Sequence, residues 1–279
     1  MRIATFIPLL TLFAAARAAD ISPSLVTSGL IGHWKFDGNA DDTSRKRAHG
    51  IVVGSPGFPD TSLGGKNIRL NGRDTLIRVP AERAPDLGSG GFSISLFVQP
   101  RRGGEQVIVS QIDDTGTGWR LIQTKELGIR LETTGRAAAA VSNIDSPANV
   151  LAYGRWGHVI VAVNRSTDTG FARLYINARH LGDGKILPFQ MKPTDLYIGG
   201  SKDTFFNGQL DELYLFNRRV NEMSRLFSPG KRFDYDPLAK NKFEQPKQAP
   251  GRFSADPVPA NPPGPFRNNE FSLKPDDVV

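Results

Sequence analysis

The chain has 279 residues, of which 39% are hydrophobic and 23% charged, and it contains no cysteine. This length is enough for one sizeable hydrophobic core, and the composition excludes a chain that is disordered throughout. The absence of cysteine excludes a disulfide scaffold, a cysteine-based zinc module, an iron–sulfur cluster and a thiol nucleophile.

The first residues have the pattern of a secretory signal peptide. Arg2 precedes an apolar run over residues 3–16, and the small-residue sequence Ala16-Arg17-Ala18 follows. The run is shorter than the ~20 apolar residues that cross a bilayer as a helix, which argues against the alternative of a retained anchor. We therefore predict that residues 1–18 are a cleaved signal peptide. The mature chain is then secreted or extracytoplasmic, at the cell surface or in the periplasm, and has no membrane span.

Short apolar segments follow, many of them with alternating apolar and polar residues. They lie at residues 92–98, 106–110, 121–123, 127–131, 158–163, 171–176, 196–198 and 210–216, and turn signals separate them at 103–104, 113–116, 133–135, 167–170 and 182–184. Many short strands without long helices between them are typical of an all-β antiparallel sandwich or barrel. One short helix is expected over residues 220–227, where Val220, Met223 and Phe227 share a face and Pro229 ends the pattern.

Residues 229–279 form a proline-rich tail. They hold ten of the 20 prolines, including the sequence PVPANPPGP at 257–265, and show no apolar period. Proline fixes φ and removes a backbone donor, so an extended, partly polyproline II segment is expected. Tail aromatics such as Phe233 and Tyr235 could dock on the domain. A spacer without a partner and a strap that binds a protein partner both remain open.

The formal net charge of +7 is spread over the first 18 residues, the domain and its tail. Two of the 35 basic residues lie in 1–18 and eight in the tail, while seven of the 28 acidic residues lie in the tail, which leaves +4 on residues 19–228. Apart from residues 45–47 the positive charges are mostly scattered, and no nucleic-acid motif is present. Nucleic acid is therefore not an expected partner, whereas an acidic polysaccharide stays open through the summed charge.

Three blocks of sequence carry a resemblance to a known family. The first is GLIGHWKFDG at 29–38, with DDTS at 41–44 and AHGI at 48–51. The second is WGHVIVAV at 156–163, followed by ARLYIN at 172–177, and the third is LYIGG at 196–200, followed by FNGQLDELYLFNR at 206–218. In order and spacing they resemble laminin G-like domains of the concanavalin A-like lectin/glucanase superfamily. The resemblance covers most of residues 19–228, which we take as one domain.

The resemblance implies a jelly roll of two antiparallel sheets and a face that is often used for glycans. Independently of it, two sheets of alternating strands can bury Trp34, Phe97 and Trp156 against one another without any helix cover. We expect these aromatic side chains in the core.

The sequence lacks the motifs of an enzyme. Glucanases of the same fold resemble one another through an E-x-D-x-x-E strand, which is absent here. The nearest carboxylate pair, Asp211-Glu212, is expected to point to opposite faces of one strand, because neighbouring strand residues alternate. No nucleophile elbow or phosphate loop is present. The four histidines, at 33, 49, 158 and 180, have no metal-ligand spacing, so we expect them to pack within strands.

Calcium is the ligand chemistry that the sequence favours most. Oxygen-bearing side chains alternate over residues 37–42, as a hard cation requires, but the pattern is not an EF-hand. The family resemblance implies a structural calcium near the opening acidic loop and the closing strand, held by Asp42 and Asp211 with Asp37. The alternative is that these aspartates cap turns through side-chain to backbone hydrogen bonds.

A glycan site is less clearly marked. Trp119 follows a glycine-rich turn and is the tryptophan least embedded in apolar sequence, so it is predicted to stack on a sugar ring while Arg120 binds hydroxyls. A core position for Trp119 is the alternative. The expected function is a secreted, non-catalytic carbohydrate-binding or adhesion module with a structural calcium. A protein-interaction domain that uses the tail, and less so a glycan-cleaving enzyme, are the alternatives.

Overall fold

The computed structural model describes residues 28–135, 140–165, 170–177, 179–187 and 189–220. Over these residues the chain forms strands and no helix. The strands are β1 (Leu30–Trp34), β2 (Ile51–Val53), β3 (Ile68–Asn71), β4 (Leu76–Val79), β5 (Phe92–Pro100), β6 (Gln106–Ile112), β7 (Gly118–Gln123), β8 (Ile129–Thr134), β9 (Val141–Asp145), β10 (Gly157–Asn164), β11 (Gly170–Ile176), β12 (Arg179–Ile186), β13 (Leu196–Ile198) and β14 (Asn207–Phe216). The predicted signal peptide, the tail and all but the first residue of the predicted helix lie outside this part.

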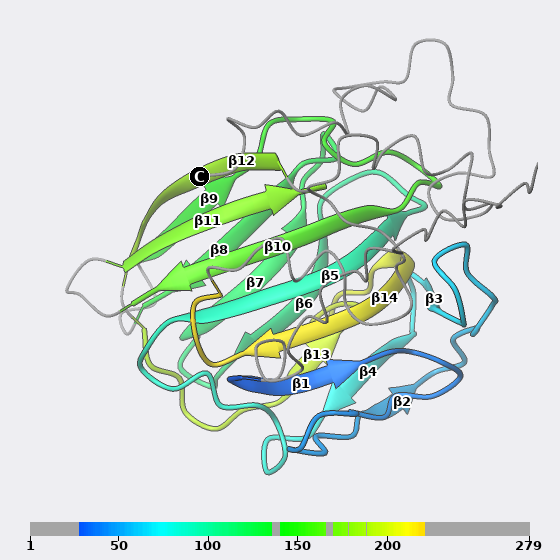
Figure 1. Ribbon diagram of the computed structural model, residues 1–279, viewed down its shortest axis with the longest axis horizontal. Helices are drawn as coiled ribbons and strands as arrows, with labels where there is room; N and C mark the ends of the chain where they lie inside the picture. Colours follow the sequence, from blue (N-terminus) through cyan, green and yellow to red (C-terminus); the bar gives the residue numbers. More distant parts are fainter. Residues whose placement is uncertain (1–27, 136–139, 166–169, 178, 188, 221–279) are drawn as a thin grey trace, which may run out of the picture.

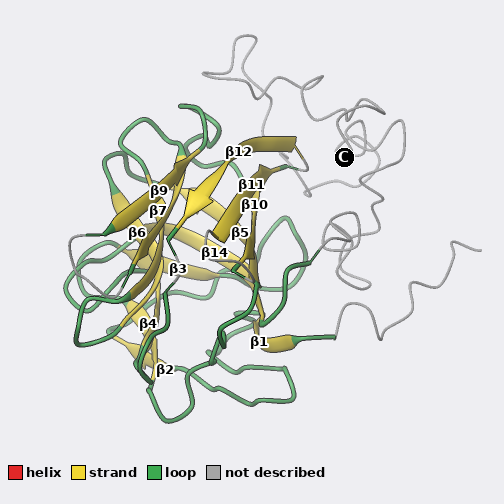
Figure 2. Cartoon of the chain, turned by 90° about the vertical axis from the view of Figure 1, so that its left-hand side faces the viewer, coloured by secondary structure: helices red, strands yellow, loops and turns green. Residues whose placement is uncertain are grey.

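The strands form two seven-stranded antiparallel sheets that lie face to face (Figure 1; Figure 2). Sheet A has the order β1-β14-β5-β10-β11-β12, with β3 also paired to β14, and sheet B has the order β2-β4-β13-β6-β7-β8-β9. In Figure 1 sheet A lies in front of sheet B. The first and last strands are neighbours, because Leu30 of β1 lies opposite Phe216 of β14. The predicted two-sheet antiparallel sandwich is confirmed.

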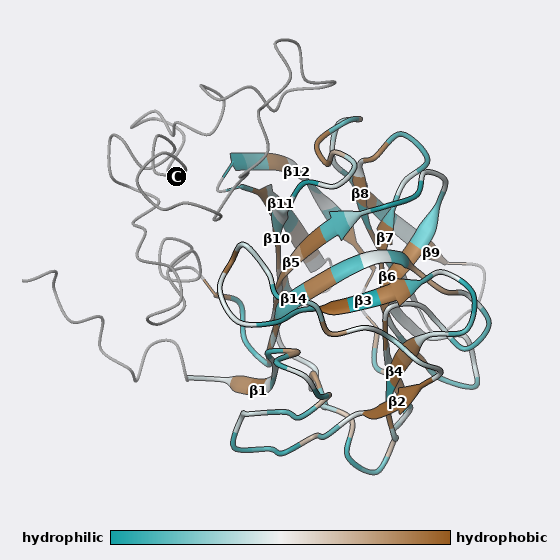
Figure 3. Ribbon diagram, turned by 90° about the vertical axis from the view of Figure 1, so that its right-hand side faces the viewer, coloured by the Kyte–Doolittle hydropathy of each residue, from teal (hydrophilic) through white to brown (hydrophobic). Residues whose placement is uncertain are grey.

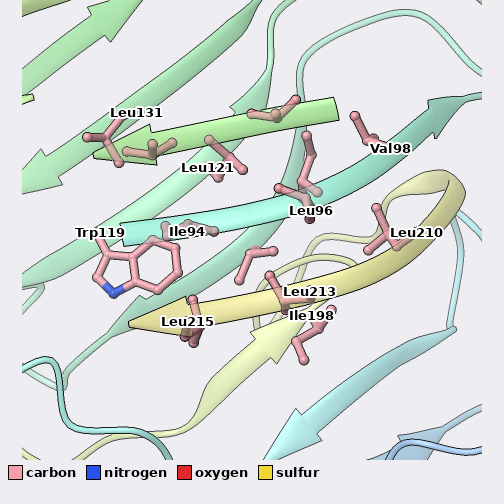
Figure 4. Close-up of a cluster of buried hydrophobic side chains, with 14 of the residues drawn as sticks. Ile94, Leu96, Val98, Trp119, Leu121, Leu131, Ile198, Leu210, Leu213 and Leu215 are labelled. Carbon is pink, nitrogen blue, oxygen red and sulfur yellow. The ribbon is translucent and has the colours of Figure 1, made fainter. Parts of the chain in front are cut away.

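The hydrophobic core lies between the two sheets. It follows from the alternation of side chains along each strand, which turns every second residue towards the other sheet. In β5 the side chains of Ile94, Leu96 and Val98 enter the core, and strands of both sheets supply the residues around them (Figure 4). Apolar surface removed from water stabilises such a sandwich by about 25 cal/mol per Å². Sheet-on-sheet burial is therefore the main stabilising contribution, and it needs no helix.

Of the three aromatic residues predicted to pack together, two lie outside the core between the sheets. Trp34 is fully buried in the core between the sheets. Phe97 is buried too, but it is out of phase with Leu96 and lies on the other face of sheet A, stacked on the ring of His158 at 4.3 Å between centroids. Trp156 is largely buried outside the core cluster. The expectation of one mutual aromatic cluster is therefore wrong.

Sequence periodicity does not predict the strands β2, β3, β4, β9 and β12. Residues 182–184, which look like a turn, lie within β12, and Thr133 and Thr134 belong to β8. A Cβ on Gly182 would lie 2.6 Å from the carbonyl oxygen of Asp145, at the end of β9. The glycine therefore allows the edges of the two sheets to approach each other and does not mark a turn.

A β-bulge in β14 changes the direction of one side chain. The register between β14 and β5 shifts between Asp211 and Tyr214, and Glu212 has φ +49°. Asp211 lies opposite Phe97, and the carboxylate of Glu212 accepts a hydrogen bond from the hydroxyl of Tyr214 at 2.8 Å. Both carboxylates therefore lie on the face of sheet A turned away from sheet B. The expectation that they point to opposite faces is wrong, because a bulge interrupts the alternation.

We expect Gly118→Ala to lower the free energy of unfolding by about 2 kcal/mol or more. Gly118 opens β7 with φ +153°, and a Cβ there would lie 2.1 Å from the carbonyl oxygen of Gln111 on β6. The two strands would have to separate. Chemical denaturation measures the loss, and Gly90→Ala is the matched control, because a Cβ at Gly90 meets nothing within 4 Å. An equal loss in both variants would contradict this account.

One edge of sheet B is apolar and exposed. β2 closes one edge of sheet B and is apolar (Figure 3), yet its three side chains are exposed.

Within the described ranges the chain has no helix that is long and apolar enough to cross a bilayer.

Candidate functional site

The three aspartates predicted to hold calcium are not brought together. Among the described residues, no group of three or more histidine, aspartate or glutamate side chains is arranged to hold a metal ion. Asp37 follows β1, and its Oδ1 accepts a hydrogen bond from the backbone N–H of Lys66 at 2.8 Å. Asp211 is fully buried on the opposite side of sheet A from the core.

Asp42 has the contacts of a turn cap. Its Oδ1 accepts hydrogen bonds from the backbone N–H groups of His33 and Ser44, both at 2.8 Å. Its Oδ2 accepts from the hydroxyl of Ser44 at 2.8 Å and from the N–H of Ala48 at 2.7 Å. The buried carboxylate thus ties the loop after β1 back onto that strand. These contacts are those of the turn-capping alternative.

The predicted sugar-binding pair, Trp119 and Arg120, is divided between the two faces of sheet B. Trp119 has no exposed surface and packs in the core, with its ring centroid 6.0 Å from that of Phe92 (Figure 4). A ring without an exposed face offers no surface to a sugar, so the expectation for Trp119 is corrected. Arg120 points the other way, and its side chain is 40% exposed.

Arg120 belongs to a line of side chains that crosses sheet B on its outer face, the face turned away from sheet A. The register joins each residue of this line to the next on the neighbouring strand, from β4 through β13, β6, β7 and β8 to β9. We call it the polar row; it consists of Arg78, Tyr197, Ser110, Arg120, Glu132 and Asn143.

At the β4 end, Asp195 connects two members of the polar row. It accepts a hydrogen bond from Arg78 Nε at 2.6 Å and another from the hydroxyl of Tyr197 at 3.2 Å. Burial opposes its ionisation, but the bonds from Arg78 and from the N–H of Ala81 outweigh burial, so the pKa of Asp195 is lowered. Burial and the charge of Asp195 raise the pKa of Tyr197. The carboxylate is therefore ionised and the phenol neutral at pH 7.

Ion pairs continue along the same face. Arg120 Nη2 lies 2.5 Å from Oε1 of Glu132, and the side chain of Glu132 is 15% exposed. On the adjoining register line, Arg130 contacts Asp145 at 2.7 Å and Glu105 at 3.3 Å. Guanidinium–carboxylate pairs hold their atoms in fixed, planar arrangements.

This arrangement suits recognition of hydroxyl-rich molecules. The arginines supply donors, the carboxylates supply acceptors, and the half-buried ring of Tyr197 supplies an apolar surface with a polar tip. Sequence reasoning found Arg120 alone among these residues. The polar positions at alternate places in each strand are visible in the sequence, but their alignment depends on the pairing register of six strands.

The outer face of sheet A carries a second set of polar groups. His33 Nε2 lies 2.6 Å from Oε2 of Glu212, and the His33 ring stacks on Tyr214 at 3.9 Å between centroids. His158 is buried and shares a hydrogen bond with the hydroxyl of Ser95 at 2.8 Å. Both histidines thus pack within strands, as expected.

The fold has many relatives among solved structures. The binding domain of botulinum neurotoxin DC, in complex with SialylT, superposes with a TM-score of 0.55 at 15% identity over 70% of this chain and 49% of that one. The receptor-binding domain of botulinum neurotoxin type G gives 0.54 at 22% identity, over 69% and 49%. This chain therefore spans about half the length of those toxin domains, and the likeness shows the fold.

A further relative has a size closer to this chain. Domain 4 of AbnA, an extracellular GH43 arabinanase from Geobacillus stearothermophilus, in complex with arabinotriose, gives a TM-score of 0.53 at 20% identity over 69% of this chain and 94% of that one. No curated protein matches this chain by sequence.

A family assignment rests on the sequence as well as on the fold. Residues 71–223, more than half of the chain, match the laminin G profile of the concanavalin A-like lectin/glucanases superfamily. The matched residues run from the end of β3 to beyond β14, so they include every strand that carries the polar row. The chain therefore belongs to the concanavalin A-like lectin/glucanases superfamily, through a laminin G-type domain.

Proposed function

We propose that this protein is a non-catalytic carbohydrate-binding module that uses the outer face of sheet B. The polar row is the observation that carries the proposal. It places an exposed arginine at two positions, a half-buried tyrosine ring between them in the register, and polar groups on the remaining strands. Ser110 is buried, with its hydroxyl donating to the carbonyl of Gly200, and the accessible members of the row suit an oligosaccharide, whose hydroxyls both donate and accept hydrogen bonds.

The relatives support a binding role in general terms. Two of them are complexes, one with SialylT and one with arabinotriose. At 15% and 20% identity they share the fold, and so they do not identify the residues that bind in this chain. The residue-level argument therefore comes from the polar row itself.

Binding without cleavage is the better account of this face. A glycosidase needs a carboxylic acid of raised pKa beside a second carboxylate. Asp195 has a lowered pKa, and Glu132 is paired with Arg120. The lowered pKa makes Asp195 a poor proton donor, and a carboxylate paired with arginine serves orientation better than acid catalysis.

The same ion pairs favour a neutral glycan over an acidic one. Arg78 and Arg120 each face a carboxylate, and their charge is largely balanced.

Calcium is not part of the proposal, since the Asp42 carboxylate already accepts four hydrogen bonds. Secretion fits the proposal, because extended polysaccharides lie outside the cell and residues 1–18 read as a signal peptide.

The test is a glycan array with the mature full-length chain, followed by calorimetric titration of the best ligand, with arabinotriose and a sialylated oligosaccharide as first probes. We expect Arg120→Ala and Tyr197→Ala each to weaken binding by about ten- to a hundred-fold, the effect of losing one charged hydrogen bond or one stacking surface. Tyr197→Phe keeps the ring and should retain most of the affinity.

Arg173→Ala is the matched control, because Arg173 lies on β11 of sheet A and not on sheet B. It should leave the affinity unchanged. Binding to no member of the array, or an equal loss in the Arg173 variant, would overturn the proposal. Preference for the sialylated probe would retain the site and contradict the inference of a neutral ligand.

A further inference from the structure

The outer face of sheet A carries an apolar cluster that is separate from the core. It consists of Ile160, Tyr175, Tyr214, Phe216 and Val220, with Leu30 packed against it. Ile160 and Phe216 have no exposed surface, and the two tyrosines are less than 10% exposed. Sheet B packs on the opposite face of sheet A, so neither described sheet covers this cluster.

Two carboxylates lie on the same face. Asp211 is fully buried and Glu212 is 3% exposed. Asp211 faces this side by the ordinary alternation of β14, and the bulge turns Glu212 to the same side, where it contacts His33 and Tyr214. Burial of a carboxylate is costly unless donors or cations accompany it. A cover that combines apolar side chains with positive charge therefore suits this face.

The chain itself leaves the described part on this face. Val220 is 2% exposed within the cluster, and its N–H donates to the hydroxyl of Ser93 on β5 at 2.9 Å. The chain then continues to Val279. Its next stretch, NEMSRLFSPGKRFDY at 221–235, supplies five large apolar or aromatic side chains and a net positive charge, with three basic residues against two acidic ones: Met223, Leu226, Phe227, Phe233 and Tyr235; Arg225, Lys231 and Arg232; Glu222 and Asp234.

Distance permits this stretch to reach the whole cluster. An extended chain covers about 3.3–3.6 Å per residue, and paired strands lie about 4.8 Å apart. The span from β14 over β5 and β10 to β11 is thus about 14 Å, which about four extended residues cross. The other candidate segment, ADISPSLVT at 19–27, is shorter and less aromatic, and it contains neither lysine nor arginine.

We propose that residues 221–235 dock on the outer face of sheet A of the same chain. Their apolar side chains cover the cluster of Ile160, Tyr175, Tyr214 and Phe216, and their basic side chains lie beside Asp211 and Glu212. The segment is then an intramolecular strap. It covers one face of the sandwich and leaves the outer face of sheet B uncovered.

The experiment uses the absence of cysteine from the chain. Ala162 lies on β10, out of phase with the core residues Val161 and Val163, and its side chain is 2% exposed. Two variants of the mature full-length chain are compared, Ala162→Cys and Asn143→Cys. We expect the thiol at position 162 to react with maleimide at least tenfold more slowly than the thiol at position 143, since Asn143 is exposed on sheet B.

Adding Leu226→Asp and Phe227→Asp to the Ala162→Cys chain should release the strap and raise the labelling rate at least tenfold. Adding Phe266→Asp and Phe271→Asp instead should leave the rate unchanged, because those residues lie beyond the proposed strap. Far-UV circular dichroism confirms that each variant is folded. Arg173→Cys, on the neighbouring strand and partly exposed, gives a second reporter should Ala162→Cys not fold.

Three outcomes would overturn the proposal. One is rapid labelling of the Ala162→Cys chain from the start, and another is an equal response to both pairs of substitutions. The third is a labelling rate that rises on dilution, or on deletion of residues 19–27, while the Leu226→Asp and Phe227→Asp pair has no effect. That result would assign the cover to a second copy of the chain or to the N-terminal segment.

Discussion

Replacement of Asp42 by alanine is expected to lower the free energy of unfolding by about 3 kcal/mol or more. Four donors from His33, Ser44 and Ala48 would lose their acceptor at a buried position. Hydrogen bonds to a charged group contribute about 1.5–3 kcal/mol each, and buried donors left without partners add a desolvation cost. Urea denaturation of the mature chain measures the change.

Asp41→Ala is the control for this variant. Asp41 is the next residue and also a carboxylate, but it is 60% exposed and its contact with His49 spans 3.3 Å. A surface pair of this kind contributes little, so the variant should lose less than about 1 kcal/mol.

A calcium titration belongs to the same experiment. If Asp42 acts as a turn cap, excess calcium and chelator should give the wild-type chain the same thermal midpoint. A midpoint that rises with calcium, and no longer rises in Asp42→Ala, would show metal binding instead, because a ligand held by the native state stabilises it by mass action.

Acidification is expected to destabilise the fold through His158. The ring is buried against Phe97, and burial lowers the pKa of its imidazole from 6.5 to about 3. Below pH 6.5 the unfolded chain therefore binds a proton at His158, whereas the native chain binds it only near pH 3. The contribution of His158 to the free energy of unfolding is fully present above pH 6.5. It falls by about 1.4 kcal/mol per pH unit below that, which amounts to a loss of roughly 3 kcal/mol at pH 4.

Other groups also respond to acid, so the measurement is a comparison of slopes. The free energy of unfolding is followed from pH 7 to pH 4 for the wild type, for His158→Gln and for His180→Gln. The first variant should lose the His158 part of the slope and the second should keep it, since the His180 side chain is 40% exposed. Equal slopes in all three would contradict the assignment.

How far the sequence predicts this molecule depends on whether a feature is local. The alternation in residues 92–98 and 158–163 is enough to identify β5 and β10, and the family resemblance is enough to identify the jelly roll. The core position of Trp119 also has a local signal, because it shares the phase of Leu121. That signal was outweighed in the prediction by the glycine-rich turn before it.

Two features depend on contacts that no single segment of the sequence shows. The polar row joins positions between residues 78 and 197, and only the pairing of six strands places them in line. The bulge at Asp211 and Glu212 adds one residue to β14 and reverses the expected direction of a carboxylate. Register and bulges arise from contacts between distant segments, and so a reading of each segment alone misses them.

The pairing of β1 with β14 has a mechanical consequence. The N–H of Asn217 donates to the carbonyl of Gly29 at 2.9 Å, and Arg218 Nε donates to the carbonyl of Ser28 at 2.8 Å. The two ends of the described chain thus lie side by side on antiparallel strands. A force that pulls these ends apart would open the β1–β14 ladder one hydrogen bond at a time, as a zipper opens, because the bonds lie along the direction of pulling and are not loaded together.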